Sequence, residues 1–110
     1  MNFVSLIGTL ANHPTEVETI KGQKHARFRL VTSNTILTAE GTSKTKRETH
    51  DVFAWGKWHQ VICAYGQPNL HVAIEGRLVN RYTRWKGRII KITEIEINDN
   101  LIKVQVIKKG

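Results

Sequence analysis

The chain has 110 residues, a length that fits one domain with a modest core, so we treat residues 1–110 as a single unit. Seventeen lysines and arginines against nine acids give a net charge of +8, and a hydrophobic content of 40% argues against a disordered chain. The charge favours an acidic partner, nucleic acid first and an anionic membrane second. No apolar run approaches a membrane span of roughly 18 residues, and the N-terminus lacks the pattern of a secretory signal. We therefore expect a cytoplasmic protein with no membrane partner.

The residue types that support catalysis or metal binding show no useful spacing. Cys63 is the single cysteine, so no intrachain disulfide can form, and its apolar neighbours predict a core position. The acids are scattered, and the five histidines lack the spacing of metal ligands. We expect no enzyme activity, no cofactor and no metal, and we expect His50 to be a structural hydrogen-bonding residue.

The first third of the chain predicts three extended segments. Residues 3–10 read as a strand, residues 15–20 as a second extended stretch, and residues 25–33 as a strand of period two. In the last of these the even positions are apolar, whereas Arg27 and Arg29 lie on a wet, basic face.

Residues 35–45 are polar and contain many threonines and serines, which predicts a mobile loop. Three basic residues close this segment, namely Lys44, Lys46 and Arg47. Such residues can be solvated or can bind a ligand, and both interpretations stay open.

Residues 46–55 predict a strand, and residues 56–65 predict one short helix. Phe53 and Trp55 share one face of the strand, but both faces carry apolar groups, so the pattern leaves the core side open. On the helix, we expect Trp58 to pack against the protein.

The strand from residue 70 to about residue 82 has a clearer pattern, with an apolar face that includes Leu78. Arg77 and Arg81 lie on its opposite face, and continued alternation adds Trp85 to that face and turns Tyr82 inward.

A hairpin turn is expected at Lys86 and Gly87. Residues 88–97 predict the returning strand, and a shift in its apolar parity suggests a bulge. A turn at residues 98–100 and a last strand over residues 101–107 complete the chain. Regularly spaced strands with one helix before the fourth major strand predict an all-β, five-stranded OB barrel.

The expected working surface follows from basic residues interleaved with aromatic ones. Residues 77–91 contain six basic residues and no acid, with Tyr82 and Trp85 among them. Such a surface can contact the phosphates of a single strand while its bases stack on aromatic rings. The candidate binding residues are Trp55, Trp85, Phe53, Lys57, Arg77, Arg81, Arg84, Lys86, Arg27, Arg29, Lys44, Lys46 and Arg47.

Each of these assignments has a structural alternative. Trp55 could pack in the core, and Arg77 could pair with Glu75 or with a neighbouring subunit. No pattern of Asn or Gln suggests base reading, so we expect little sequence preference.

The ordered motifs of residues 1–97 carry a family resemblance. They are Asn2 with Val4 and Leu6-Ile7-Gly8, the stretch from Ala26 to Ser33, His50, Trp55-Gly56-Lys57, and Ile74-Glu75-Gly76-Arg77-Leu78. In these motifs the chain resembles bacterial single-stranded DNA-binding protein. The resemblance implies an OB fold, a homotetramer, and binding of single-stranded DNA without sequence specificity during replication, repair and recombination.

Position by position, the resemblance places Trp55, Lys57 and Arg81 on family positions of matching character. Ile36 and Thr49 stand where the family usually stacks bases on Trp. Thr83 occupies a third such position, and Asp51 replaces a usual Arg. The resemblance therefore implies a thinner stacking set, in which Trp55, Trp85, Phe53 and Trp58 would compensate.

The family usually ends in a long segment with an acidic tip that recruits other replication proteins, whereas this sequence stops at Lys108-Lys109-Gly110. If that end is natural, recruitment through a tail is not expected. A primosomal replication protein, which is a short OB relative that binds single-stranded DNA as a dimer, is then the alternative. A third reading is an OB module that binds RNA or another protein.

Overall fold

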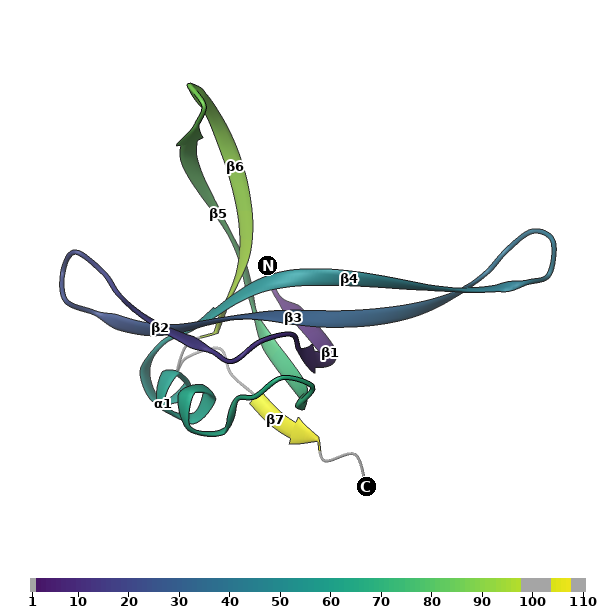
Figure 1. Ribbon diagram of the computed structural model, residues 1–110, viewed down its shortest axis with the longest axis horizontal. Coiled ribbons are helices and arrows are strands. Elements are labelled where there is room, and N and C mark those ends of the chain that lie inside the picture. Colours follow the sequence, from purple (N-terminus) through teal and green to yellow (C-terminus); the bar gives the residue numbers. More distant parts are fainter. Residues whose placement is uncertain (1, 98–103, 108–110) are drawn as a thin grey trace.

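The chain forms a small barrel from which two β-hairpins project. The computed structural model describes residues 2–97 and the backbone of residues 104–107 (Figure 1). Its elements are β1 (Val4–Leu10), β2 (Thr15–Glu18), β3 (Lys24–Leu37), β4 (Ser43–Ala54), α1 (Gly56–Tyr65), β5 (His71–Trp85), β6 (Arg88–Ile97) and β7 (Val104–Ile107). Each of these elements corresponds to a strand or helix predicted from the sequence, although several bounds differ.

Five strands close the barrel in the order β1, β3, β4, β6 and β5, with β5 returning to pair with β1. The β4–β6 pairing is parallel, and the other pairings of the barrel are antiparallel. Outside this closed path, β2 pairs with β3 and β7 pairs with β5. This is the OB arrangement, so the predicted fold is confirmed.

Alternating residues of the barrel strands fill the core. Val52, Ala54, Val72 and Ile74 point inward with the even positions of β3, and each is almost fully buried. Helix α1 packs on β3 and β4, where it contributes the buried Ile62. Burying each aliphatic side chain of this kind stabilises the fold by about 1.5–3 kcal/mol. The core therefore holds the barrel strands, and with them the outward faces, in fixed positions.

Two glycines allow the barrel strands to approach closely. A Cβ atom on Gly8 would collide with the carbonyl oxygen of Val31, and one on Gly76 would collide with the carbonyl oxygen of Glu96. Glycine at these positions permits a close backbone approach that other residues would prevent.

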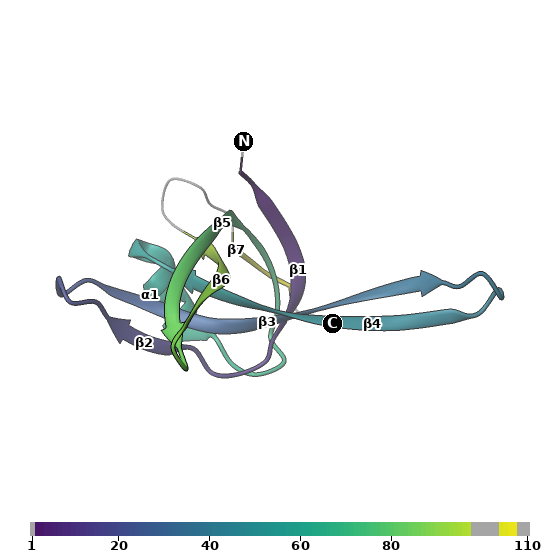
Figure 2. The same cartoon turned by 90° about the horizontal axis from the view of Figure 1, so that it is seen from above.

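The β3–β4 hairpin extends far beyond the barrel (Figures 1 and 2). Its strands remain paired from residues 26 and 54 out to Leu37 and Ser43. The mobile loop expected over residues 35–45 is therefore wrong, and only the short tip between the strands is a turn. The polar composition was misleading, because a two-stranded ladder is held by backbone hydrogen bonds and β-branched Thr residues favour it.

The β5–β6 hairpin is a second arm, and it stands away from the barrel in another direction (Figure 1). Its register runs unbroken from the Arg77–Glu96 pair to the Trp85–Arg88 pair, so the expected bulge is absent from this pairing. Lys86 and Gly87 adopt positive φ angles of 48° and 76°, which confirms the predicted hairpin turn.

Two predictions of buried side chains on this arm are wrong. Tyr82 and Leu78 were expected on the inward face of β5, yet both side chains are exposed. The alternation continues along the strand, but the arm has left the barrel, so its inward face has no core to meet. The apolar parity shift in β6 has the same cause, because Ile95 and Ile97 enter the core while Ile90 lies on the projecting arm.

The core position predicted for Cys63 is also wrong, because its side chain is exposed on α1. By contrast, Trp58 packs against the core as predicted, and His50 lies within hydrogen-bonding distance of Thr32, with 3.0 Å between Nε2 and Oγ1.

The predicted turn at residues 98–100 and the first residues of the last predicted strand lie outside the described residues. Within the described part of the chain, no helix is long and apolar enough to cross a membrane.

Candidate nucleic-acid interface

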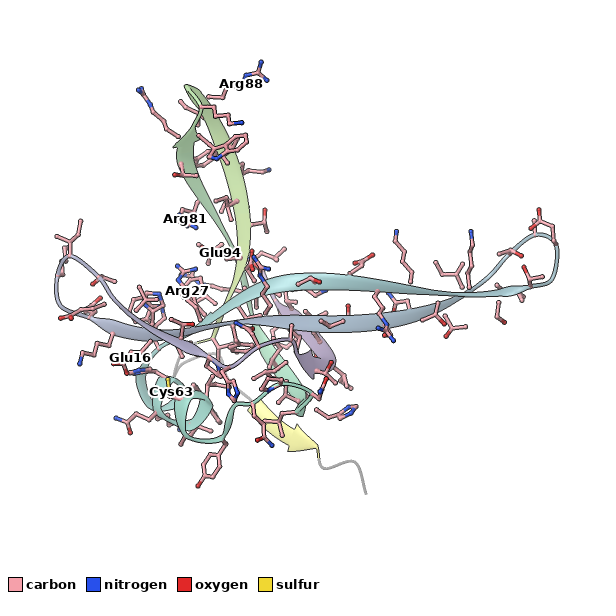
Figure 3. All side chains as sticks on the ribbon, in the orientation of Figure 1. Glu16, Arg27, Cys63, Arg81, Arg88 and Glu94 are labelled. Atoms are coloured by element: carbon pink, nitrogen blue, oxygen red, sulfur yellow. The ribbon has the colours of Figure 1, made fainter. Side chains whose placement is uncertain are left out.

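A buried carboxylate organises the outer face of the barrel where the β5–β6 arm begins. Glu94 of β6 is only 3% exposed. It accepts hydrogen bonds from Arg27 Nη1 of β3 and, at 3.1 Å, from Arg81 Nε of β5. Figure 3 shows these three side chains converging at the base of the arm. One acid therefore joins arginines from two different strands.

The ionisation of Glu94 reflects two opposed effects. Burial alone would raise the pKa of its carboxyl group, but the hydrogen bonds and charges of Arg27 and Arg81 outweigh burial and hold the pKa below its ordinary value. Glu94 is therefore a carboxylate at neutral pH, and it neutralises part of the positive charge on this face.

A second carboxylate repeats this arrangement two residues further along β6. Glu96 is 13% exposed at its side chain and accepts a hydrogen bond of 2.6 Å from Arg77 Nε. Its other oxygen accepts a hydrogen bond of 3.2 Å from the indole Nε1 of Trp55. Trp55 is thereby fixed at the edge of the face rather than in the core.

Aromatic rings cluster beside these acids. The ring of His25 in β3 lies near Phe53 of β4 and near Trp55, which directly follows β4, with centroid distances of 5.7 Å and 4.5 Å. The guanidinium of Arg27 lies 5.2 Å from the centroid of the Phe53 ring, within cation–π range. Burial and then the charge of Arg27 lower the pKa of His25 below 6.5, so this ring is neutral at pH 7.

Phe53 and Trp55 were both predicted to stack on bases, but the two side chains differ in accessibility. Phe53 is only 7% exposed, so its ring supports Arg27 and His25 and offers almost no surface to a base. Trp55 is half-buried and keeps part of its ring accessible.

The β5–β6 arm carries the exposed tryptophan of the predicted surface. Trp85 is 60% exposed, and Lys86 Nζ lies 4.5 Å from the centroid of its ring. Because β5 alternates without interruption, Trp85 lies on the same face as Arg77 and Arg81, as predicted. Arg88 lies at the tip of the arm (Figure 3).

The cations near the tip differ from those at the base of the arm. Arg84, Lys86 and Arg88 form no ion pair with any described residue, whereas Arg77 and Arg81 are paired with acids. Of these cations, Lys86 and Arg88 lie beside Trp85, whereas Arg84 lies on the opposite face of β5.

The remaining predicted cations lie elsewhere. On the β3–β4 arm, Lys44 and Arg47 have no acidic partner among the described residues, while Lys46 pairs with Glu48 at 3.8 Å. Arg29 pairs with Asp51 at 3.3 Å on the outer face of the barrel. The structure thus divides the thirteen candidates among the barrel face, two separate arms and, for Lys57, helix α1.

Lys57 occupies the start of α1, where its Nζ lies 5.6 Å from the centroid of the Trp58 ring.

A groove of about 340 Å³ lies beside Glu94, within the range of about 300–1,000 Å³ typical of small-molecule sites. It is lined by Asn12, Thr15, Val17, Arg27, Phe28, Arg29, Asp51, Val52, Arg81, Ile92 and Glu94. The three arginines of this lining are paired with its two acids, Glu94 and Asp51.

Sequence reasoning missed Glu94, Glu96 and His25 as parts of this face. A usable signal was present, because counting back from the turn at Lys86 and Gly87 pairs Arg77 with Glu96. The acids of β6 also alternate with the buried Ile95 and Ile97, which places them on the opposite face from the core.

Comparison with known proteins agrees with this geometry. Residues 1–106 match the model of the Single-strand binding protein family. The chain is 38% identical over 81 residues to Single-stranded DNA-binding protein 1 of Chlorobaculum tepidum, which covers 74% of this chain and 50% of that protein. It is 31% identical over 88 residues to the Single-stranded DNA-binding protein of Xanthomonas campestris pv. campestris, covering 80% of this chain and 50% of that protein. The chain therefore spans about half the length of these curated relatives.

Solved structures share the fold at lower sequence identity. The Plasmodium falciparum SSB complex with ssDNA matches with a TM-score of 0.89 and 23% identity, covering 98% of this chain and 96% of that one. A deletion mutant of the single-stranded DNA binding protein from Thermus aquaticus matches with a TM-score of 0.82 and 19% identity, covering 99% of this chain and 51% of that one.

Proposed function

Because the chain belongs to the Single-strand binding protein family, we propose that it binds single-stranded DNA with little sequence preference and acts as a binding protein rather than an enzyme. The observation that carries this proposal is the β5–β6 arm, where the exposed Trp85 lies beside Lys86 and Arg88, two cations that have no acidic partner in the described part of the chain.

The proposed mechanism combines phosphate contacts with base stacking. Arg84, Lys86 and Arg88 neutralise phosphates and release counterions, and each contact adds about 0.7 to the salt dependence for a single strand. Trp85 and the accessible part of Trp55 stack on bases, each contributing about 1–3 kcal/mol. Unlike hydrogen-bonded readout, stacking accepts every base, which explains the lack of sequence preference.

The biological role that fits this chemistry is the coating and protection of single strands exposed during replication, repair and recombination, in the cytoplasm at the nucleoid. The proposal concerns the DNA-binding surface of residues 1–110 and does not include recruitment of other proteins.

We propose a homotetramer as the working assembly, with a dimeric adaptor of the primosomal type as the alternative. Phe3 and Ile7 project exposed apolar side chains at and beside β1, and association would remove this surface from water. Light scattering on the purified protein separates a tetramer from a dimer, and a stable monomer would contradict both.

The stacking assignment is tested by replacing Trp55 and Trp85 together with alanine. We expect the double variant to lose more than half of the free energy of binding to oligo(dT). Tyr65→Ala is the matched control, because Tyr65 is an exposed aromatic on α1, outside both arms, and its removal should leave affinity unchanged. Loss of less than half of the binding free energy in the double variant would refute the assignment.

The choice of nucleic acid is tested by competition among matched single-stranded DNA, RNA and duplex DNA. The proposal predicts that the DNA single strand displaces a labelled oligo(dT) most effectively. Preference for RNA would favour the RNA-binding module, and no binding by any of the three would favour a protein-interaction module.

A further inference from the structure

Three side chains with metal-ligating atoms meet on the side of the barrel where β2 lies against α1. His59 and Cys63 are four positions apart in α1, so both project from the same face of the helix. Glu16 of β2 approaches them from the neighbouring strand. Figure 3 shows Glu16 and Cys63 close together beside the helix.

The ligating atoms are already close to one another. One carboxylate oxygen, one imidazole nitrogen and the Cys63 sulfur all lie within 4.8 Å of each other. His59 Nε2 is 2.6 Å from Glu16 Oε2, and the His59 side chain is only 14% exposed, so the imidazole is held in place. In a tetrahedral zinc site neighbouring ligand atoms are about 3.3–3.6 Å apart, so only small side-chain movements separate this arrangement from a coordinating one.

The ligand types select the ion. Thiolate and imidazole are preferred ligands of Zn²⁺, whereas Mg²⁺ and Ca²⁺ prefer oxygen ligands alone. A thiolate and a carboxylate would also balance the two charges of the ion, with the imidazole neutral. We propose that Glu16, His59 and Cys63 form a Zn²⁺ site with three protein ligands and a fourth position open to water.

A lysine side chain next to the site contacts one of its proposed ligands. Lys24 Nζ lies 3.7 Å from Glu16 Oε1, the carboxylate oxygen that is not in contact with His59. Lys24 therefore holds one oxygen and leaves Oε2 directed at the imidazole, which favours coordination through a single oxygen. Zn²⁺ bound here would join β2, which pairs only with β3 among the described strands, to the helix.

The site explains why Cys63 is exposed on the helix surface rather than packed in the core. It also uses residues that the proposed DNA-binding face does not, so zinc binding and DNA binding can be tested independently.

The test uses Co²⁺ as a spectroscopic substitute for Zn²⁺ in the purified full chain, kept reduced and stripped of metal. We expect a thiolate-to-cobalt charge-transfer band and visible bands of four-coordinate cobalt, saturating at one ion per chain and removed by added Zn²⁺. Cys63→Ser should abolish the charge-transfer band. His59→Gln and Glu16→Gln should each weaken Co²⁺ binding at least about tenfold, since even loss of a supporting residue costs this much. His13→Gln, at an exposed position outside the cluster, is the control and should bind as the unsubstituted chain does.

Circular dichroism shows whether each variant folds, and a measurement on the unsubstituted chain needs no variant at all. Stoichiometric Zn²⁺ should slow the reaction of Cys63 with an aromatic disulfide reagent at least about tenfold, because coordination occupies the thiolate that reacts. Absence of both the charge-transfer band and this protection would overturn the proposal. Retention of full Co²⁺ affinity in folded His59→Gln and Glu16→Gln would also overturn it, because the cysteine would then be binding metal alone.

Discussion

Replacing Glu94 by glutamine should lower the stability of the barrel and strengthen its binding to single-stranded DNA. Glutamine has nearly the same shape as glutamate, so the core beneath the strand is undisturbed. The change removes the negative charge that Arg27 and Arg81 share. Both arginines then keep their full positive charge on the outer face.

The loss of stability follows from the two hydrogen bonds. Glutamine keeps one acceptor oxygen and places an NH2 donor where Glu94 has its second oxygen, so one of the two arginine hydrogen bonds is lost. A hydrogen bond to a charged group contributes about 1.5–3 kcal/mol, so this loss lowers the free energy of unfolding by about 2 kcal/mol before screening. The arginine side chains are 33% and 48% exposed and can turn to water, which reduces this cost. We expect a net loss of about 1–2 kcal/mol in urea denaturation at pH 7.

The gain in binding follows from the released charge. One additional phosphate contact would steepen the slope of log K against log salt by about 0.7, with tighter binding at low salt. The assay is titration of fluorescent oligo(dT) at several salt concentrations. Glu18→Gln is the control, because it changes net charge equally at an exposed position at the end of β2.

Two results would refute the reasoning. Weaker binding by Glu94→Gln with an unchanged salt slope would mean that Glu94 positions the arginines for phosphate instead of neutralising them. Unchanged stability would mean that the pairing with Arg27 and Arg81 contributes nothing to the fold.

Three further predictions concern stability and titration. The pKa of His25 is lowered, so its NMR titration should have a midpoint below 6.5. Protonation of His25 then favours the unfolded chain, so the free energy of unfolding should fall as the pH drops below 6.5. The folded variant His25→Gln should show no such loss. Gly76→Ala forces a methyl group against the Glu96 carbonyl and should cost about 1–3 kcal/mol in urea denaturation, and a cost near zero would contradict the close approach of β5 and β6. Trp85→Ala should change the free energy of unfolding by less than about 0.5 kcal/mol, because the side chain is exposed on the arm, and a larger loss would mean that Trp85 packs against the protein.

Period-two alternation predicted the barrel because every core strand buries one face. The even positions of β3 illustrate this, and so do Val72 and Ile74 of β5, which are both fully buried. Alternation failed where strands continue beyond the core. Tyr82 keeps the phase of β5 but has nothing to pack against, and no local pattern reveals where a strand leaves the barrel.

The candidate site was predicted at the level of charge and aromatic content, since residues 77–91 do carry exposed cations around Trp85. The pairing of Arg27 with Glu94 could not be read from residues 67 positions apart without the β3–β4–β6–β5 order of the barrel. The cluster of Glu16, His59 and Cys63 was missed for a similar reason, because Glu16 comes from another element than the other two residues.

The claim that single strands bind through tryptophan stacking and phosphate contacts is tested most directly by intrinsic tryptophan fluorescence during titration with oligo(dT), at about 50 mM and 200 mM salt. Stacking on Trp85 and Trp55 predicts strong quenching at the lower salt and a weaker affinity at the higher one. Absence of both quenching and binding at the lower salt would contradict the account.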